Sequence, residues 1–183
     1  MRRFVDSILA VLCLIIFSPL LLVCAIAIRM EDGLPVIYSQ ERIGLHGKPF
    51  MIYKFRSMRM NAEEDGAPLL LEKKGDNRLT HVGRFLRRHH LDELPQLWNV
   101  LKGDMAFIGP RPERKYYIDQ IIEQDPRYVY LYQIRPGVTS YATLYNGYTD
   151  SIEKMIRRLD LDLYYMEHRS VWLDTKILAK TFI

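Results

Sequence analysis

The sequence contains little cysteine and lacks the motifs of several common binding classes. Its 183 residues include 2 cysteines, Cys13 and Cys24, and both lie in one apolar run. This excludes a zinc site or a disulfide framework and suits a reducing compartment. The net charge is +4, yet no Lys/Arg block or nucleic-acid motif occurs, so nucleic acid is not an expected partner. We find no internal repeat and no low-complexity linker.

A long apolar run is present near the N-terminus. Residues 7–28 carry no formal charge and would form a helix of about 33 Å, enough to cross a hydrocarbon core of roughly 30 Å. Ser18 and Pro19 lie in its middle, however. Pro19 has no amide hydrogen and its ring crowds the carbonyl of Ile15, which kinks or breaks a helix. Each arm would then be too short to cross the membrane alone.

The flanks of this run are positive at both ends, with Arg2 and Arg3 before it and Arg29 after it. Positive charge on both sides favours keeping both ends in the cytoplasm. We therefore predict a re-entrant, broken helix that enters one leaflet and returns. Two alternatives stay open, because prolines also occur in helices that cross once, and because the N-terminus resembles a secretory signal.

The remainder predicts an α+β fold that is mostly helical. We expect a re-entrant membrane segment at 1–29 and one compact cytoplasmic domain at 30–183. Strands at 34–40 and 49–55, joined by a turn at 44–47, would form a short β-hairpin. The predicted helices occupy residues 80–90, 113–124 and 150–167, with another that starts at Pro95. Residues 61–77 predict a mobile loop, and the apolar character of 172–183 runs to the last residue, which is compatible with a truncated chain.

Two adjacent acids, Asp92 and Glu93, precede Pro95 and a helical apolar pattern. Proline favours the first helical position, so both acids should lie at a helix N-terminus. There the backbone dipole would stabilise their negative charge and lower their pKa values. The apolar pattern consists of Leu94, Leu97, Trp98 and Leu101.

Several cations accompany the acid pair. Arg84, Arg87 and Arg88 should crowd it from one side, and Arg111 follows in a Gly-Pro-Arg-Pro turn. Such an arrangement suits a phosphorylated substrate together with a metal ion. The plainer interpretation is that the acids are helix caps and the arginines are solvated. Two more cations, Lys54 and Arg56, stand at the end of the second predicted strand.

Nearly the whole chain resembles the monotopic phosphoglycosyl transferases, also called bacterial sugar transferases, in their small catalytic-core form. The resemblance rests on Ser18-Pro19 in the apolar run and on four further motifs. These motifs are 40–44 (QERIG), 53–58 (YKFRSM), 91–113 (LDELPQLWNVLKGDMAFIGPRPE) and 135–139 (RPGVT). The long central string carries most of the specificity.

The resemblance implies transfer of a sugar-1-phosphate from a UDP-sugar to undecaprenyl phosphate, which begins assembly of a surface glycan. It also implies a Mg²⁺ cofactor and a place in the bacterial inner membrane, with the catalytic domain on the cytoplasmic face. Membrane lipids are the other expected partners, and we keep a homodimer open. Asp92 would be the nucleophile, forming an aspartyl-phosphosugar and releasing UMP, and Glu93 would help to hold Mg²⁺ with Asp92.

Phosphate-binding roles follow from the same resemblance. Arg87 and Arg111 stand where the family carries phosphate-contacting arginines, and Lys54, Arg56 and Arg135 lie in its other motifs. Guanidinium groups suit this task because they form forked hydrogen bonds.

The chain departs from the family at Tyr148, where many members carry an arginine, so a substrate contact there is in doubt. Asp174 matches a recurrent acid near the C-terminal end, and an ordinary structural role for it is equally compatible with the sequence.

Two other functions remain as alternatives. One is a membrane-anchored interaction module whose basic face holds an acidic partner without catalysis. The other is a glycosyltransferase that moves only the sugar and releases UDP. The absence of a Rossmann-type glycine fingerprint disfavours the second. So does the position of Asp160-Leu161-Asp162, which has the letters of a metal motif but lies in a helical pattern.

Overall fold

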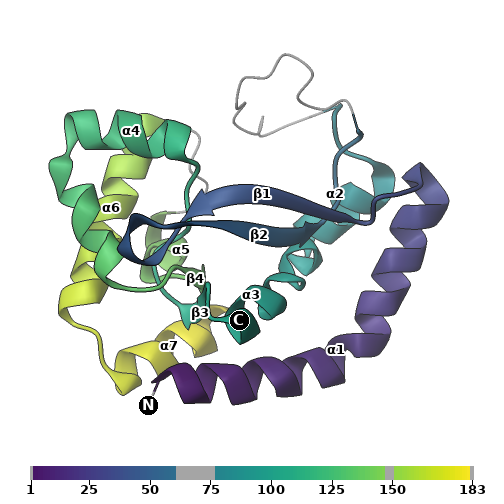
Figure 1. The fold of residues 1–183 in the computed structure, drawn as a ribbon, viewed down its shortest axis with the longest axis horizontal. Helices are drawn as coiled ribbons and strands as arrows, with labels where there is room; N and C mark the ends of the chain where they lie inside the picture. Colours follow the sequence, from purple (N-terminus) through teal and green to yellow (C-terminus); the bar gives the residue numbers. More distant parts are fainter. Residues whose placement is uncertain (1, 61–76, 147–150, 182–183) are drawn as a thin grey trace. The chain divides into compact units, whose positions relative to one another are not determined.

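The computed structural model describes residues 2–60, 77–146 and 151–181, and it separates into two compact units. The first unit comprises Met1–Gln40 and Ile52–Leu101, and the second comprises Glu41–Met51 and Lys102–Ile183. Each unit has its own hydrophobic core. The strands β1 (Ile37–Ile43) and β2 (Pro49–Phe55) form a hairpin through which the chain passes from one unit into the other and back (Figure 1).

The first element is the helix α1 (Arg2–Asp32), whose 31 residues would measure about 46 Å if straight. Figure 1 shows it as two arms that meet at a bend. Pro19 lies inside the helix and cannot donate to the carbonyl of Ile15. The Ser18 hydroxyl donates to that carbonyl at 2.8 Å instead. The predicted break is therefore a bend within a continuous helix, with its freed carbonyl satisfied by the neighbouring serine.

One stripe of α1 packs against the rest of the first unit. Cys24 and Ile28 are buried against Phe55 and Leu86. Among the described residues, α1 is the helix that is long and apolar enough to cross a membrane. Its other faces expose large apolar side chains, namely Phe4, Val5, Ile8, Val11, Leu12, Ile15, Ile16, Phe17, Leu22, Val23, Ile26 and Met30. So much contiguous exposed apolar surface is typical of contact with lipid or a partner.

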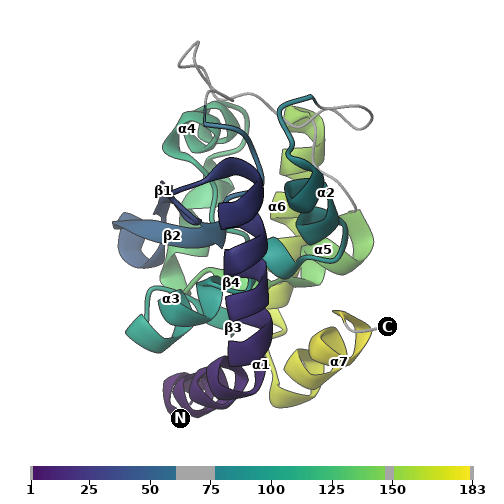
Figure 2. The same cartoon turned by 90° about the vertical axis from the view of Figure 1, so that its right-hand side faces the viewer.

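The first unit continues with three short helical elements. These are α2 (His81–Arg88), the 3₁₀ turn η2 (Leu91–Glu93) and α3 (Gln96–Lys102). α2 begins after Thr80, whose hydroxyl accepts a hydrogen bond from the Gly83 amide at 2.9 Å. α1 and α2 lie side by side in both views (Figures 1 and 2).

The second unit is built around a short parallel pair of strands, β3 (Ala106–Ile108) and β4 (Gly137–Thr139). Ala106 pairs with Gly137, and Ile108 pairs with Thr139. Its core contains Ile108, Tyr165 and Ile177. The other elements of this unit are η1 (Leu45–Gly47), α4 (Lys115–Gln124), η3 (Pro126–Gln133), α5 (Tyr141–Asn146), α6 (Ile152–Glu167) and α7 (Val171–Thr181).

The α+β, mostly helical fold and the short hairpin are confirmed. The bounds of β2 match the prediction, but β1 begins at Ile37 because Pro35 just before it has no amide for the ladder. The strands β3 and β4 were not predicted, since three residues are too few to show a periodic pattern. Residues 61–76 of the predicted loop lie outside the described ranges. The division into 1–29 and 30–183 stays a prediction.

Candidate active site

In the first unit, Asp92 lies where the chain reverses between α2 and α3. His90 adopts the left-handed conformation with φ 55°, which ends the path of α2 and starts η2. Left-handed conformations are uncommon for residues with a side chain and are often found at functional sites. The reversal buries Asp92, which is 6% exposed.

Both acids precede the start of a helix, as the position of Pro95 predicts. They lie in η2, and α3 begins at Gln96. Burial raises the pKa of Asp92, and the charge of Glu93 raises it further, while interactions with Lys54, Arg87 and His90 lower it by less. The expected lowering of the Asp92 pKa is therefore corrected. A carboxylate that loses hydration is destabilised more than these neighbours stabilise it.

Two cations adjoin the acid pair. The Lys54 ammonium pairs with the Glu93 carboxylate at 2.5 Å, and both side chains are less than a fifth exposed. The Arg87 Nε donates to the Ser57 hydroxyl at 2.8 Å, while its Nη1 is buried without a hydrogen-bond partner among the described residues. The structure thus brings together Lys54, Arg87, Asp92 and Glu93; of the two cations, the sequence predicted only Arg87 beside the acids. Arg84 and Arg88 are exposed instead.

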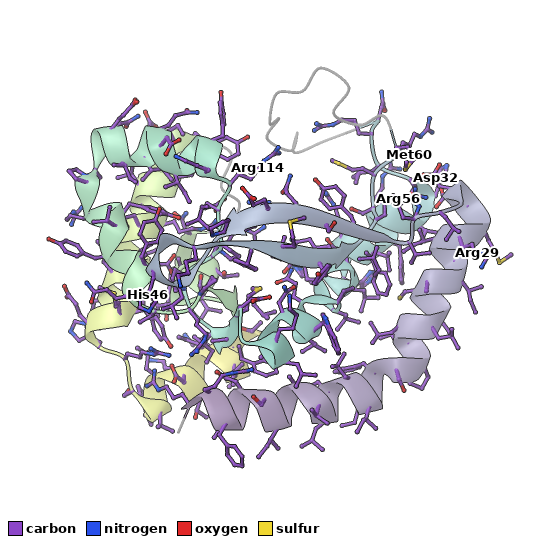
Figure 3. The ribbon with its side chains drawn as sticks, viewed as in Figure 1. Arg29, Asp32, His46, Arg56, Met60 and Arg114 are labelled. Atoms are coloured by element: carbon purple, nitrogen blue, oxygen red, sulfur yellow. The ribbon has the colours of Figure 1, made fainter. Side chains whose placement is uncertain are left out.

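Arg56 holds the end of α1. Its Nη2 donates to the carbonyl oxygens of Asp32 and Gly33 at 2.7 and 3.1 Å and pairs with the Asp32 carboxylate at 3.2 Å. Figure 3 shows Asp32, Arg56 and Met60 close together. A guanidinium so engaged serves the fold directly, and its predicted contact with phosphate stays a prediction.

In the second unit, the turns that carry Arg111 and Arg135 are hydrogen-bonded to each other. The amide of Gly137 donates to the carbonyl of Pro110 at 2.9 Å. A Cβ on Gly137 would lie 2.1 Å from the Gly109 nitrogen, so both glycines are required by the close backbone approach. Arg135 Nε donates to the carbonyl of Gly103 at 2.9 Å.

The carboxylate of Glu113, two residues after Arg111, lies close to three arginine side chains. Arg158, Arg42 and Arg111 lie 3.4, 3.6 and 3.9 Å from it. Asp162 is buried beside them, and this burial raises its pKa to about 7, although Arg158 and backbone amides oppose the shift. The sequence did not predict this cluster, because its members come from distant segments.

Comparison of the sequence with known proteins shows the family of this chain. The sequence model that describes the bacterial sugar transferase family matches residues 1–183 of this chain. The chain belongs to this family.

Three relatives illustrate the range of names within the family. A UDP-N-acetylgalactosamine-undecaprenyl-phosphate N-acetylgalactosaminephosphotransferase of Aeromonas hydrophila is 42% identical, covering 98% of this chain and 42% of the relative. A UDP-glucose:undecaprenyl-phosphate glucose-1-phosphate transferase of Caulobacter vibrioides is 42% identical over 98% of this chain and 67% of the relative. An uncharacterised sugar transferase of Bacillus subtilis is 38% identical, covering 99% and 85%. The chain thus spans less than half of the first relative.

The chemistry of the acid pair suits a Mg²⁺ ion. Mg²⁺ prefers oxygen ligands and is usually held by one or two carboxylates, with water and substrate phosphates completing its shell. Asp92 and Glu93 supply two adjacent carboxylates, and their mutual repulsion would be relieved by a divalent cation. No cluster of three or more metal-binding side chains occurs within the described ranges, so substrate oxygens would have to contribute.

Sequence reasoning missed two residues that shape this site, Ser57 and Gly83. A Cβ on Gly83 would lie 2.0 Å from the Ser57 carbonyl oxygen, so α2 can approach the backbone of Ser57 this closely only with glycine there. An isolated glycine inside a short helix was the available signal. Asp174 accepts a hydrogen bond from the buried Tyr165 hydroxyl at 2.6 Å, and Tyr148 lies outside the described residues.

Proposed function

We propose that this protein transfers a sugar-1-phosphate from a UDP-sugar to undecaprenyl phosphate and releases UMP. The observation that carries the proposal is the buried Asp92 beside Glu93, Lys54 and Arg87. The relatives from Aeromonas hydrophila and Caulobacter vibrioides are each named for a UDP-sugar and for transfer to undecaprenyl phosphate, which supports the same substrates here.

The first step is attack by an Asp92 carboxylate oxygen on the phosphorus that bears the sugar. A new oxygen–phosphorus bond forms, the bond to the bridging oxygen of UMP breaks, and UMP leaves with those electrons. Asp92 must be ionised to attack, so the cations Lys54 and Arg87 serve it by opposing the rise of its pKa. The Nη1 of Arg87, buried without a partner among the described residues, is available to a phosphate oxygen.

In the second step, an oxygen of the lipid phosphate attacks the same phosphorus. The bond to Asp92 breaks, the carboxylate is regenerated, and the lipid carries the phosphosugar through a diphosphate. Covalent catalysis divides one difficult transfer between a soluble and a lipid substrate into two easier steps. A Mg²⁺ ion held by Asp92 and Glu93 would neutralise phosphate charge in both steps.

The membrane helix supports a location at the lipid surface. α1 is bent, exposes apolar side chains and packs directly against the elements that carry Asp92. We propose that it enters the inner membrane from the cytoplasmic face and returns, so that the catalytic elements face the cytoplasm at the depth of a lipid phosphate. Initiation of a surface glycan would follow from this product.

The nucleotide product tests the proposal. Full-length protein in nanodiscs would receive Mg²⁺, undecaprenyl phosphate and a panel of donors that includes UDP-glucose and UDP-N-acetylgalactosamine. We expect UMP from at least one donor, loss of UMP in Asp92→Asn, and no loss in the exposed surface control Asp119→Asn. With the lipid omitted, mass spectrometry should find one phosphosugar on the wild type and none on Asp92→Asn.

Other products would contradict the proposal. Release of UDP would indicate an ordinary glycosyltransferase. Donor binding that survives Asp92→Asn without any nucleotide release would favour the anchored interaction module.

A further inference from the structure

The two ends of α1 contact the two ends of one chain segment, residues 81–102. At the C-terminal end of α1, the Glu31 carboxylate accepts hydrogen bonds from the backbone amides of His81 and Val82 at 2.6 and 2.7 Å. At the N-terminal end, the Arg3 guanidinium donates to the carbonyl oxygens of Val100 and Leu101. The segment between these contacts contains α2, η2 and α3.

The charges match the helix ends that they meet. The first amides of α2 have no partner within the helix and carry partial positive charge, which a carboxylate satisfies. The last carbonyls of α3 carry partial negative charge, which a guanidinium satisfies through two donors. If Glu31 and Arg3 exchanged places, each side chain would meet a helix end of its own sign. The two contacts therefore require this orientation of the charges. We call these contacts of Glu31 and Arg3 the α1 clamp.

The residues of the proposed reaction lie between the two contacts. Arg87 stands near the end of α2, and Asp92 and Glu93 form η2. Gly83 touches the Ser57 backbone so closely that a Cβ would not fit, and Arg87 bonds to the Ser57 hydroxyl. A shift of α2 along its axis would therefore move the Arg87 guanidinium relative to Asp92.

The C-terminal end of α1 is itself fixed to β2. The buried Arg56 binds the carbonyl oxygens of Asp32 and Gly33 as well as the Asp32 carboxylate. Glu31, which directly precedes these residues, therefore starts from an anchored position. The bend in α1 lies between this anchored end and Arg3, so the shape of the membrane helix determines how far apart the two contacts are.

We propose that Glu31 and Arg3 are positioning residues, through which the bent membrane helix holds Arg87 and Asp92 in register for phosphosugar transfer. The inference rests on the proposed function for its catalytic part. Neither side chain needs to touch the substrate, since both act on the backbone at the ends of the catalytic segment. A membrane helix with this role is part of the active-site framework as well as an anchor.

The test uses full-length protein in nanodiscs with two readouts. The variants are Glu31→Ala and Arg3→Ala, with the exposed residues Glu123→Ala and Arg29→Ala as matched controls. Hydrogen exchange should become faster in residues 81–102 of the two clamp variants and stay unchanged in 115–124. The kcat for UMP release should fall about tenfold, the scale expected for small misplacements of reacting groups, with KM for the donor changed less than about twofold.

Conservative variants separate positioning from a general loss of structure. Glu31→Gln and Arg3→Lys each keep a hydrogen-bonding group and should recover part of kcat. Unchanged hydrogen exchange in residues 81–102 of the clamp variants would overturn the proposal. Faster exchange together with a normal kcat would also overturn it. So would a fall in kcat for Arg29→Ala as large as that for Arg3→Ala. If the wild type releases no UMP from any donor, the proposed function fails, and hydrogen exchange alone decides whether the clamp exists.

Discussion

At Asp92, burial and charge act in opposite directions on one carboxyl group. Loss of hydration and the neighbouring Glu93 raise its pKa, and Lys54, Arg87 and His90 oppose the rise. In the proposed reaction Asp92 has to be ionised, so that reaction would depend on Lys54 and Arg87, which restrain this shift. The same conflict recurs at Asp162, where burial dominates and the pKa rises to about 7.

Removal of the Lys54 charge should make the reaction more sensitive to acid. In Lys54→Gln the pKa of Asp92 rises further, and the ionised fraction is lost as the pH falls through a higher value. For each protein we compare the rate of UMP release at acidic pH with the rate at alkaline pH. We expect this ratio to be several-fold lower in Lys54→Gln than in the wild type. A pH–rate profile measures this ratio, with the exposed Lys48→Gln as control. Parallel profiles for both variants and the wild type would contradict it.

Asp162 should make the stability of the fold depend on pH. Its pKa is about 7 in the folded protein against 3.8 for the ordinary group, so between these values only the folded chain binds the proton. This contribution to stability is fully present below the lower value and is lost as the pH rises through the higher one. Asp162→Asn removes the titration.

Thermal unfolding at about pH 5 and about pH 8.5 measures the effect. The wild type should lose more stability over this interval than Asp162→Asn does. An equal loss in both proteins would show that Asp162 is ionised in the fold over the whole interval.

At the scale of the element, close backbone approaches position the helices. α2 approaches the backbone of Ser57 at Gly83, and its first turn is capped by Thr80 and by Glu31 from α1. These constraints matter more than helix propensity, because α2 has only 8 residues and such a short helix is not stable alone.

Gly83→Ala should therefore be destabilising although alanine favours helices. The added Cβ would lie 2.0 Å from the Ser57 carbonyl, and overpacking of this kind costs about 1–3 kcal/mol. Alanine returns about 1 kcal/mol of helix propensity, so the net change lowers the thermal midpoint. Arg84→Ala, an exposed position next to it, should leave the midpoint unchanged. A more stable Gly83→Ala would refute the close approach.

Pro19→Ala should change the path of α1. Alanine restores an amide that can donate to the Ile15 carbonyl, so the bend loses its cause. A straight α1 of about 46 Å exceeds the hydrocarbon thickness. In sealed vesicles, a tag at the N-terminus should lie on the same side as the catalytic domain in the wild type. In a large fraction of the variant molecules it should move to the opposite side. The same accessibility in both proteins would count against a re-entrant helix.

At the scale of the whole molecule, the apolar helix α1 shares one core with the elements that flank Asp92. Cys24 and Ile28 of α1 are buried with Phe55 and Leu86. Polar contacts add to this packing at both ends of the helix, through Arg3 and Glu31. The first compact unit accordingly contains α1 together with β2, α2 and α3.

Residues 33–183 alone should not form the native structure. Removal of α1 would expose Phe55 and Leu86 and leave the buried Arg56 without its partners at Asp32, and an unpaired buried charge is strongly destabilising. We expect an aggregated chain without UMP release, measured by size-exclusion chromatography and the nucleotide assay. A soluble, folded and active fragment would instead support the boundary predicted at residue 29.

The sequence alone determined the features that depend on local pattern. The charge-free run with Ser18-Pro19 predicted a bent apolar helix, because proline removes one donor wherever it stands in a helix. The string from Leu91 to Glu113 indicated the family, and adjacency in the chain already joined Asp92 to Glu93. The fold class followed from periodicity, although the strands β3 and β4 were too short to be seen.

The partners and the hydration of the charged side chains became visible in the three-dimensional structure. It placed Asp92 under burial that raises its pKa, assigned Arg56 to the end of α1, and collected three arginines on Glu113. It also joined Arg3 and Glu31 to the two ends of the segment 81–102. The hydration of a charged side chain and its long-range partners depend on which distant residues come together in the fold. Local sequence patterns do not specify those contacts.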